Sequence, residues 1–357
     1  EEPARTRRLR TPSPSLRSDE GGLQAARGLR TPTPLASAMD LIQDQAGLLK
    51  RLAGPTSIPS NDPFWYELFS FAAPLSQIDP AEAEKALGPV VDELAGNDDS
   101  TRHVAKLIVH TAETVQAAQG SKQVGMPLNA VNATYLTRIV LKRIAEQAPL
   151  ERVAYTMDDI EPEGNASGTT NVAGSLVSTL VEYASRAKIS PDTYLLHVEV
   201  LNLLLVTCST QLYSPNVVHD EDVHVFLEGL VECKGAAPAL VQRLLNMFIQ
   251  RPAPPARLPL WQPGAGAPPR PGVLSSVGRA ASSVIFAPWN AIAYLAAPAS
   301  EGGCPLADAS LLLLLVLVNY PPPPRLGGGA ASANPFRMAL VELQDSYHVA
   351  GEGRVEG

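Results

Sequence analysis

Apolar residues recur at helical spacing along most of the chain from residue 38 onward. One such stripe ends before Gly54 and Pro55, a pair that stops helices. The clearest largely apolar faces are Leu41, Leu48, Leu49 and Leu52; Val104, Leu107, Ile108, Thr111 and Val115; and Leu128, Val131, Tyr135, Ile139 and Val140. No segment alternates between apolar and polar residues as a half-buried strand does. The pattern therefore predicts an all-α fold, either an α-solenoid or another packed helical array.

Capping signals mark where two of these helices begin. In SIPSNDPFWYELFSF, Asp62 is a candidate N-cap, and Pro63 can take the first helical position because its missing N–H is not needed there. Asp79 and Pro80 repeat the arrangement before a helix that is expected to end at Gly96. The local chemistry thus agrees with the periodicity.

Further helices are predicted near residues 172–187, 192–212, 220–233 and 237–250. The second of these is apolar on nearly every side. A helix without a polar face is not expected on a surface, so this one is placed in the core.

The stretch ASLLLLLVLVNYPPPP, residues 309–324, contains eight consecutive apolar residues, Leu311 to Val318. A membrane-spanning helix needs about 20 such residues, so this run is too short to cross a bilayer. A buried strand remains an alternative for so short a run, but the high Leu content and the cap candidates Asp308 and Ser310 favour a helix. Because its run is apolar on every side, the helix is predicted to lie centrally in the core.

Composition divides the chain into a tail, a helical domain and proline-rich loops. Residues 1–37 are rich in Arg, Pro and Ser and are predicted to be disordered. The helical domain is expected over residues 38–346, with a Pro-rich loop at 251–275 and a Pro/Gly-rich loop at 321–333. Residues 347–357 form a polar end with no evident cap, which is expected for a truncated array.

The net charge and the cysteines indicate which partners and which compartment fit the sequence. A formal net charge of −8, without a nucleic-acid-binding motif, argues against nucleic acid as a partner. Three widely spaced cysteines favour a reducing compartment over a disulfide framework, and the N-terminus lacks the apolar segment of a signal peptide. The sequons at Asn132 and Asn165 are then expected to be chance matches.

Few residues suggest catalysis or metal binding. The sequence contains no nucleophile elbow, phosphate-binding loop or zinc-protease motif, so neither an enzyme nor a cofactor is predicted. The exception is HDEDVH, residues 219–224, whose histidines lie five positions apart and so project from different faces of a helix. An acidic helix start is the preferred interpretation, and a metal-dependent enzyme is the alternative.

His103 and His110 share a helix face and could flank a site, although structural histidines are commoner.

Two groups of residues are the candidates for an interaction surface. Phe64 and Trp65 are aromatic residues at helical spacing, which usually belong to a core; an exposed hot spot for a partner is the alternative. Arg138, Lys142 and Arg143 form a basic patch on one predicted helix. A solvated face is the default for this patch, and contact with an anionic lipid surface or an acidic partner is the alternative.

Three segments, in order, resemble the dymeclin family of Golgi-associated proteins. They are LLKRLAGPTSIPSNDPFWYELFSF at residues 48–71, LLNMFIQRPAPP at 244–255, and SLLLLLVLVNY at 310–320 followed by NPFRMAL at 334–340. The resemblance covers about residues 48–345 and implies an armadillo- or HEAT-like helical solenoid. Family members commonly begin with a Met-Gly myristoylation pattern, from which this chain departs because it starts at Glu1.

The resemblance also implies a function. It predicts a non-enzymatic, cytoplasmic scaffold on the Golgi membrane periphery that supports Golgi organisation and vesicle-mediated transport through contacts with trafficking proteins. The residues alone leave two alternatives open: the metal-dependent enzyme, and a module that binds lipid surfaces through the Arg-rich tail and the patch from Arg138 to Arg143.

Overall fold

The structure is a computed structural model. It describes residues 38–120, 125–147, 153–154, 156, 171–209, 224–255, 304–320 and 333–352, all of them in the unit Ala36–Gly357. The predicted disordered tail at 1–37 and most of both predicted proline-rich loops lie outside these residues.

The described residues form helices and no strands, as the periodicity predicts. The α-helices are α1 (Ala38–Asp44), α2 (Ala46–Ala53), α3 (Phe64–Leu68), α4 (Pro80–Thr101), α5 (His103–Gly120), α6 (Leu128–Gln147), α8 (Val172–Arg186), α9 (Tyr194–Cys208), α10 (Val225–Glu232), α11 (Ala237–Gln250), α14 (Pro305–Asn319) and α15 (Pro335–Glu352). Two short 3-10 helices, η1 (Leu75–Gln77) and η3 (Cys233–Ala236), complete the described elements.

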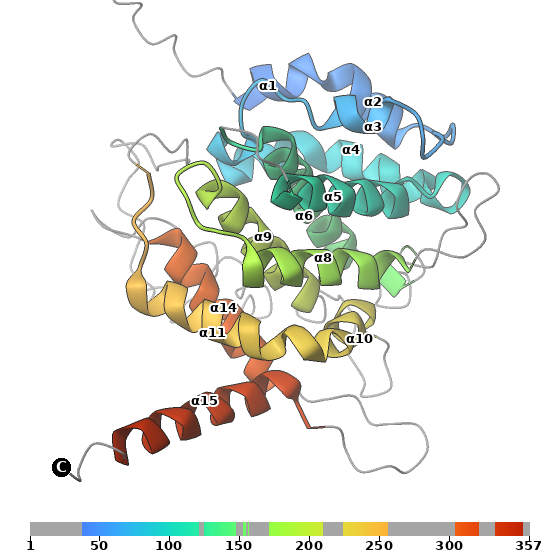
Figure 1. The fold of residues 1–357 in the computed structure, drawn as a ribbon. Helices are drawn as coiled ribbons and strands as arrows, with labels where there is room; N and C mark the ends of the chain where they lie inside the picture. The colour runs from blue at the N-terminus through green and yellow to red at the C-terminus, as the bar shows by residue number, and fades with distance from the viewer. Residues whose placement is uncertain are drawn as a thin grey trace, which may run out of the picture. The chain divides into compact units, whose positions relative to one another are not determined.

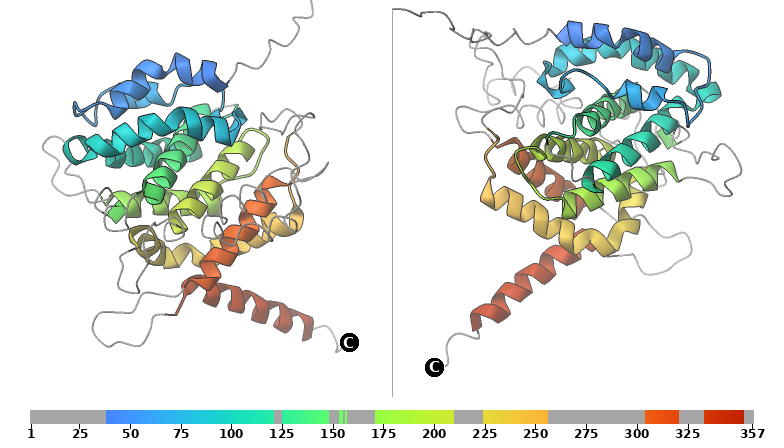
Figure 2. Two further views of the ribbon diagram at one scale, coloured as in Figure 1. Left: turned by 180° about the vertical axis from the view of Figure 1, so that it is seen from behind. Right: turned by 45° about the horizontal axis from the view of Figure 1, so that its top comes forward.

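The helices stack as pairs, which is how an α-solenoid is built. Helices α5 and α6 pack on each other, and α5 packs on α8 while α6 packs on α9. The pattern repeats when α8 contacts α11 and α9 contacts α14. Figure 1 shows the outer layer α5, α8 and α11 one below another, and Figure 2 shows the same stack from two further sides. Each pair buries its apolar face against the next, so the array gains its core by repetition.

Helix α9 forms the centre of this core, as its sequence predicts. Every residue from Tyr194 to Cys208 is buried except Asn202, which is half-buried. The layers on both sides explain the burial, because α9 contacts α6, α8 and α14. Because other helices surround α9, no side of it faces solvent and none needs to be polar.

Side-chain caps lie before α4, α3 and α15, but the cap candidates Asp308 and Ser310 are wrong, because α14 already begins at Pro305. The Asp79 carboxylate accepts the Ala81 N–H at 2.8 Å at the start of α4, and the Asp62 carboxylate accepts the Phe64 N–H at 2.8 Å before α3. The Asn334 side chain accepts the Phe336 N–H at 2.9 Å and also donates to two carbonyl groups at the end of α14. These contacts satisfy backbone groups that have no partner within the helix.

The expected end of α4 at Gly96 is wrong, because the helix continues to Thr101. It ends at Arg102, whose φ of 54° lies in the left-handed region. The Asp98 carboxylate then accepts the Val104 N–H at 2.8 Å and starts α5. Gly96 is tolerated inside the helix at a cost of roughly 1 kcal/mol relative to alanine, so a glycine alone does not define a terminus.

The leucine run forms a helix, α14, but it is not buried on every side. Leu313, Leu314 and Leu317 face the core, where α14 packs on α9 and α11. Leu315 is 48% exposed, which corrects the prediction of a fully enclosed helix. Among the described residues, α14 lies in the last of the stacked pairs, so one of its sides meets no further pair.

Candidate functional site

Phe64 and Trp65, two of the five candidate surface residues, lie in the core. Each is at most 2% exposed. The Trp65 indole N–H donates to the Pro59 carbonyl at 2.9 Å, and the Arg51 guanidinium lies 4.8 Å from the centre of the Phe64 ring. In this structure both aromatics are therefore core residues, and neither ring is exposed.

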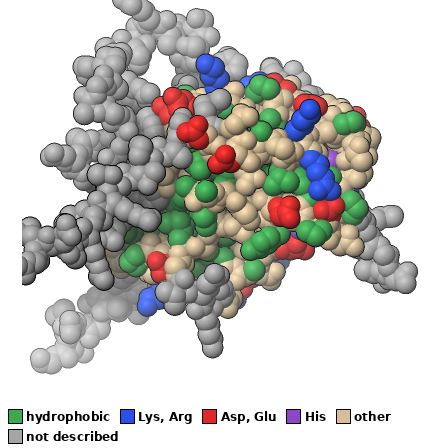
Figure 3. All heavy atoms as spheres, turned by 90° about the horizontal axis from the view of Figure 1, so that it is seen from above, with side chains coloured by type: hydrophobic (Ala, Val, Ile, Leu, Met, Phe, Trp, Pro, Cys, Tyr) green, Lys and Arg blue, Asp and Glu red, His purple; other side chains and the backbone are tan. Residues whose placement is uncertain are grey.

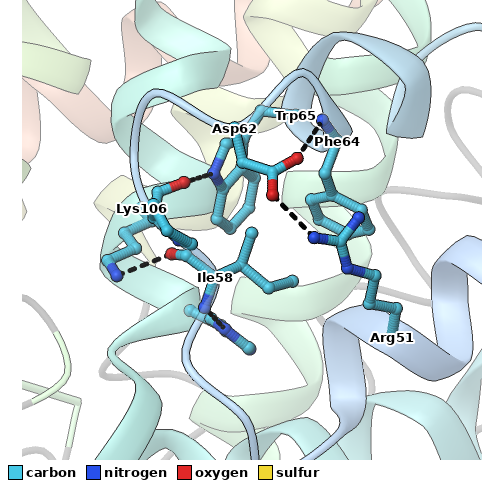
Figure 4. Close-up of polar contacts among 8 residues, drawn as sticks. Arg51, Ile58, Asp62, Phe64, Trp65 and Lys106 are labelled. Carbon is cyan, nitrogen blue, oxygen red and sulfur yellow. Dashed lines mark hydrogen bonds and ion pairs between the residues drawn. The ribbon is translucent and has the colours of Figure 1, made fainter.

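The loop between α2 and α3, residues 54–62, is held in place by contacts from neighbouring side chains, which we call the clamp (Figure 4). These aromatics belong to the clamp. The Ile58 carbonyl accepts a hydrogen bond from Lys106 Nζ at 2.8 Å. The Ile58 N–H donates to His103 Nε2 at 2.9 Å, and His103 Nδ1 lies 2.7 Å from the Leu52 carbonyl oxygen. Side chains of α5 thus satisfy buried polar groups of a loop about 45 residues earlier in the chain.

The clamp is closed on its outer side by an ion pair. Arg51 Nη2 lies 2.7 Å from Asp62 Oδ2. The pKa of Asp62 is lowered, first by the hydrogen bond from the Phe64 amide and then by Arg51. Asp62 therefore both caps α3 and ties it to α2.

The two histidines that were candidates to flank a site, His103 and His110, both contact Trp65. The His110 ring stacks on the indole with centroids 4.9 Å apart, and the His103 ring meets it edge-on at 6.0 Å. Burial lowers the pKa of His103 below its usual 6.5. Both rings have structural contacts, which is the commoner role given above for histidines of this kind.

The predicted basic patch on α6 is largely buried and paired with acids. The side chains of Arg138, Lys142 and Arg143 are 12%, 8% and 39% exposed. Their partners are Glu199 for Arg138, Glu84 and Glu146 for Lys142, and Asp92 for Arg143. Arg138 and Lys142 are thus paired within the fold, whereas Arg143 and Asp92 pair at the surface, so the three cations do not form a solvated, unpaired basic face.

Arg138 makes the deepest of these pairs. Its Nε lies 3.2 Å from Glu199 Oε2, and its guanidinium carbon lies 4.6 Å from the centre of the Tyr135 ring. Burial raises the pKa of Tyr135 above its ordinary value. The Arg138–Glu199 pair joins α6 to α9, two helices of one layer of the array.

The sequon at Asn132 also proves to be interior. Asn132 is fully buried; its side chain accepts the Leu75 N–H at 2.9 Å and donates to the Phe69 carbonyl at 3.3 Å. The folded chain therefore does not present this asparagine for modification. The second sequon, Asn165, lies outside the described residues.

Exposed apolar residues that the sequence analysis did not single out lie mainly on the last helices. Among the described residues, the large hydrophobic side chains between 48% and 73% exposed are Tyr66, Ile249, Leu315, Met338 and Val341. Ile249 lies on α11, Leu315 on α14, and the last two on α15; these three helices pack on one another. The signal in the sequence was the spacing of Met338 and Val341, three residues apart on the side of α15 away from Phe336 and Ala339.

The charge distribution is mixed on the face seen from above in Figure 3, where acidic and basic side chains alternate with apolar ones. In the described ranges, no cluster of three or more His, Cys, Asp or Glu residues has the arrangement of a metal site. Most of the HDEDVH motif, residues 219–223, lies outside those ranges, and His224 immediately precedes α10.

None of the helices, as far as they are described, is long and apolar enough to cross a bilayer.

Comparison with known protein families shows which family the chain belongs to. A family model described as "Dymeclin: Dyggve-Melchior-Clausen syndrome protein" matches residues 35–353, which includes every described helix. The chain belongs to the dymeclin family. Its similarity to dymeclin of Mus musculus is 29% identity over 275 residues, or 74% of this chain and 40% of the relative. Dymeclin of Gallus gallus is 27% identical over 308 residues, or 84% of this chain and 44% of the relative.

The match to dymeclin covers the helical domain but not the whole length of the relatives. Dymeclin of Xenopus laevis, 27% identical over 276 residues, is likewise covered to 40%. The chain thus spans about two fifths of the length of these curated dymeclins. No solved structure matches the chain significantly.

Proposed function

We propose that this chain is a non-enzymatic scaffold that acts in the cytoplasm at the Golgi membrane periphery. In this proposal it supports Golgi organisation and vesicle-mediated transport by contacting trafficking proteins. The observation that carries the proposal is the match of the dymeclin family to residues 35–353, the whole described array. An array of stacked helix pairs offers a long surface for protein partners, in keeping with such a role.

The apolar side chains of α15 support a role through protein contacts. Phe336 and Ala339 are buried where α15 packs on α11 and α14, whereas Met338 and Val341 on the other side are about half exposed. A helix with apolar residues on two sides is suited to contact a second element in addition to its own core. Exposed methionine also adapts to varied partner shapes.

The proposal is tested by the location of the tagged chain in cells. We expect overlap with Golgi markers, and we expect the double variant M338S/V341S to lose much of it. The matched control is Y66S, which removes an exposed aromatic from α3, far along the chain from α15. A tagged chain that ignores Golgi markers would overturn the proposal. If both variants localise like the unmodified chain, the exposed residues of α15 do not contribute to localisation.

A further inference from the structure

A cavity of about 480 Å³ lies where the end of α8 meets α11. Its volume falls within the range of about 300–1,000 Å³ that is typical of small-molecule sites. The residues that line it are Arg186, Lys188, Ile189, Arg243, Asn246, Met247, Gln250 and Pro252. The first three come from the end of α8 and the segment after it, and the others come from α11 and the residues that follow.

The wall of the cavity is fixed by hydrogen bonds before any ligand arrives. Arg243 Nη2 donates to the Ala187 carbonyl at 2.8 Å and so ties α11 to the end of α8. The segment after α8 is closed by Thr193, whose hydroxyl donates to the Lys188 carbonyl at 2.7 Å and accepts the Ser190 N–H at 2.9 Å. A site held in this way needs little ordering when a ligand binds.

The lining contains three cations and two carboxamides but no carboxylate. Lys188 is exposed, and no described carboxylate pairs with its ammonium group. Arg186 pairs with Glu182 at 3.0 Å, but these side chains are 71% and 49% exposed, so the pair is weak and can exchange for a ligand. Arg243 is half-buried and adds a third cation to the lining.

The cavity contains more positive charge than is needed to stabilise the C-termini of the two helices that end there. Both α8 and α11 end near the cavity, and each C-terminus carries about half a negative charge that a nearby cation stabilises. One cation is enough to balance both ends. The other two remain for an anion, together with the amides of Asn246 and Gln250, because the exposed pair of Arg186 with Glu182 can exchange.

We propose that this cavity binds a multiply phosphorylated polyol, either a soluble inositol phosphate or the phosphorylated headgroup of an inositol lipid. Guanidinium groups bind phosphate oxygens in pairs, and the lysine adds a point charge. The carboxamides suit hydroxyl groups, since they both donate and accept hydrogen bonds. No aromatic ring lines the cavity, so it lacks the stacking surface that a nucleotide base would use. The site does not depend on the scaffold function proposed above.

The test is calorimetric titration of the purified chain with inositol hexakisphosphate, with ATP and inorganic phosphate as comparisons. The variant is R186Q/K188Q, because both side chains are exposed and the fold should survive their loss. The matched control is K85Q/K234Q, which removes the same charge at exposed positions outside the cavity. We expect the cavity variant to bind at least about tenfold more weakly and the control to change less than about twofold.

Vesicle co-sedimentation separates the two sources of the ligand. Phosphatidylcholine vesicles with and without phosphatidylinositol bisphosphate are compared for the same three proteins. Binding to the phosphoinositide vesicles that R186Q/K188Q loses assigns the cavity to a lipid headgroup; binding of the soluble compound alone assigns it to a free inositol phosphate. The proposal is overturned if neither binds, if both variants behave alike, or if ATP or a glutamate-rich peptide binds as tightly as the inositol phosphate.

Discussion

The imidazole of His103 accepts a hydrogen bond from the backbone N–H of Ile58 at 2.9 Å. Its other ring nitrogen lies 2.7 Å from the Leu52 carbonyl oxygen, which can only accept. The ring is therefore neutral and carries its proton on Nδ1. This one side chain joins α5 to the end of α2 and to the loop that leads to α3, so it fixes the start of the array.

Removal of the His103 ring should destabilise the protein. In His103→Ala, the buried Ile58 N–H and Leu52 carbonyl lose their partner, at a cost of about 2–5 kcal/mol. Urea unfolding measures the loss. His103→Gln, whose carboxamide can donate and accept, is expected to recover part of it, and a loss below about 1 kcal/mol in the alanine variant would contradict the clamp.

The same histidine should make stability depend on pH. Because burial lowers the pKa of His103 in the folded protein below 6.5, the unfolded chain binds the proton more readily. The contribution of His103 to the free energy of unfolding is therefore complete above its ordinary pKa of 6.5 and is lost as the pH falls below that value. Burial lowers the pKa of His197 as well, so it contributes in the same direction. His103→Gln should flatten this dependence, and an unchanged slope would speak against a buried neutral ring.

The buried pair of Arg138 and Glu199 should be costly to break but not to replace. Arg138→Met leaves the Glu199 carboxylate buried without a partner, so we expect a loss of about 3–5 kcal/mol. The double variant with Glu199→Met should recover most of it, as a double-mutant cycle of chemical denaturation would show.

An exposed pair provides the control for this cycle. Arg186→Met breaks the pair with Glu182, in which the side chains are 71% and 49% exposed, and should cost less than about 1 kcal/mol. Equal losses at Arg138 and Arg186 would mean that the Arg138–Glu199 pair is not buried in solution.

The leucine run should respond according to the side of α14 that each residue occupies. Leu313 is fully buried, so Leu313→Ala is expected to lower the free energy of unfolding by about 2–5 kcal/mol. Leu315 is half exposed, and Leu315→Ala should cost less than about 1 kcal/mol. Thermal unfolding of the two variants compares them directly, and similar losses would support the enclosed helix that the sequence suggested.

Gly96 offers a stabilising substitution. It lies inside α4, and an added Cβ would have no atom within 4 Å, so Gly96→Ala should stabilise by about 0.5–1 kcal/mol. The matched control is Gly229→Ala, where a Cβ on α10 would lie 3.3 Å from the Gly174 Cα on α8 and offset the gain. Destabilisation by Gly96→Ala in denaturant titrations would indicate that the helix ends at this glycine.

The sequence by itself determined the helical fold, some of the helix starts and the family. Helical spacing and caps are local properties, so Asp62 and Asp79 were identified from their neighbours in the chain alone. The burial of α9 was also predicted from its lack of a polar face, although the same argument was wrong for Leu315 of α14.

Only the tertiary structure decided which charged and apolar side chains are exposed. Arg138 lies 61 residues from Glu199 in the chain, and nothing in their local sequence predicts that stacked helices bring them together. Likewise Leu313 and Leu315 are chemically identical and two residues apart, and only the helices that pack on α14 make one buried and the other exposed. Burial and ion pairing are relations between distant segments, so they depend on the packing that periodicity leaves open.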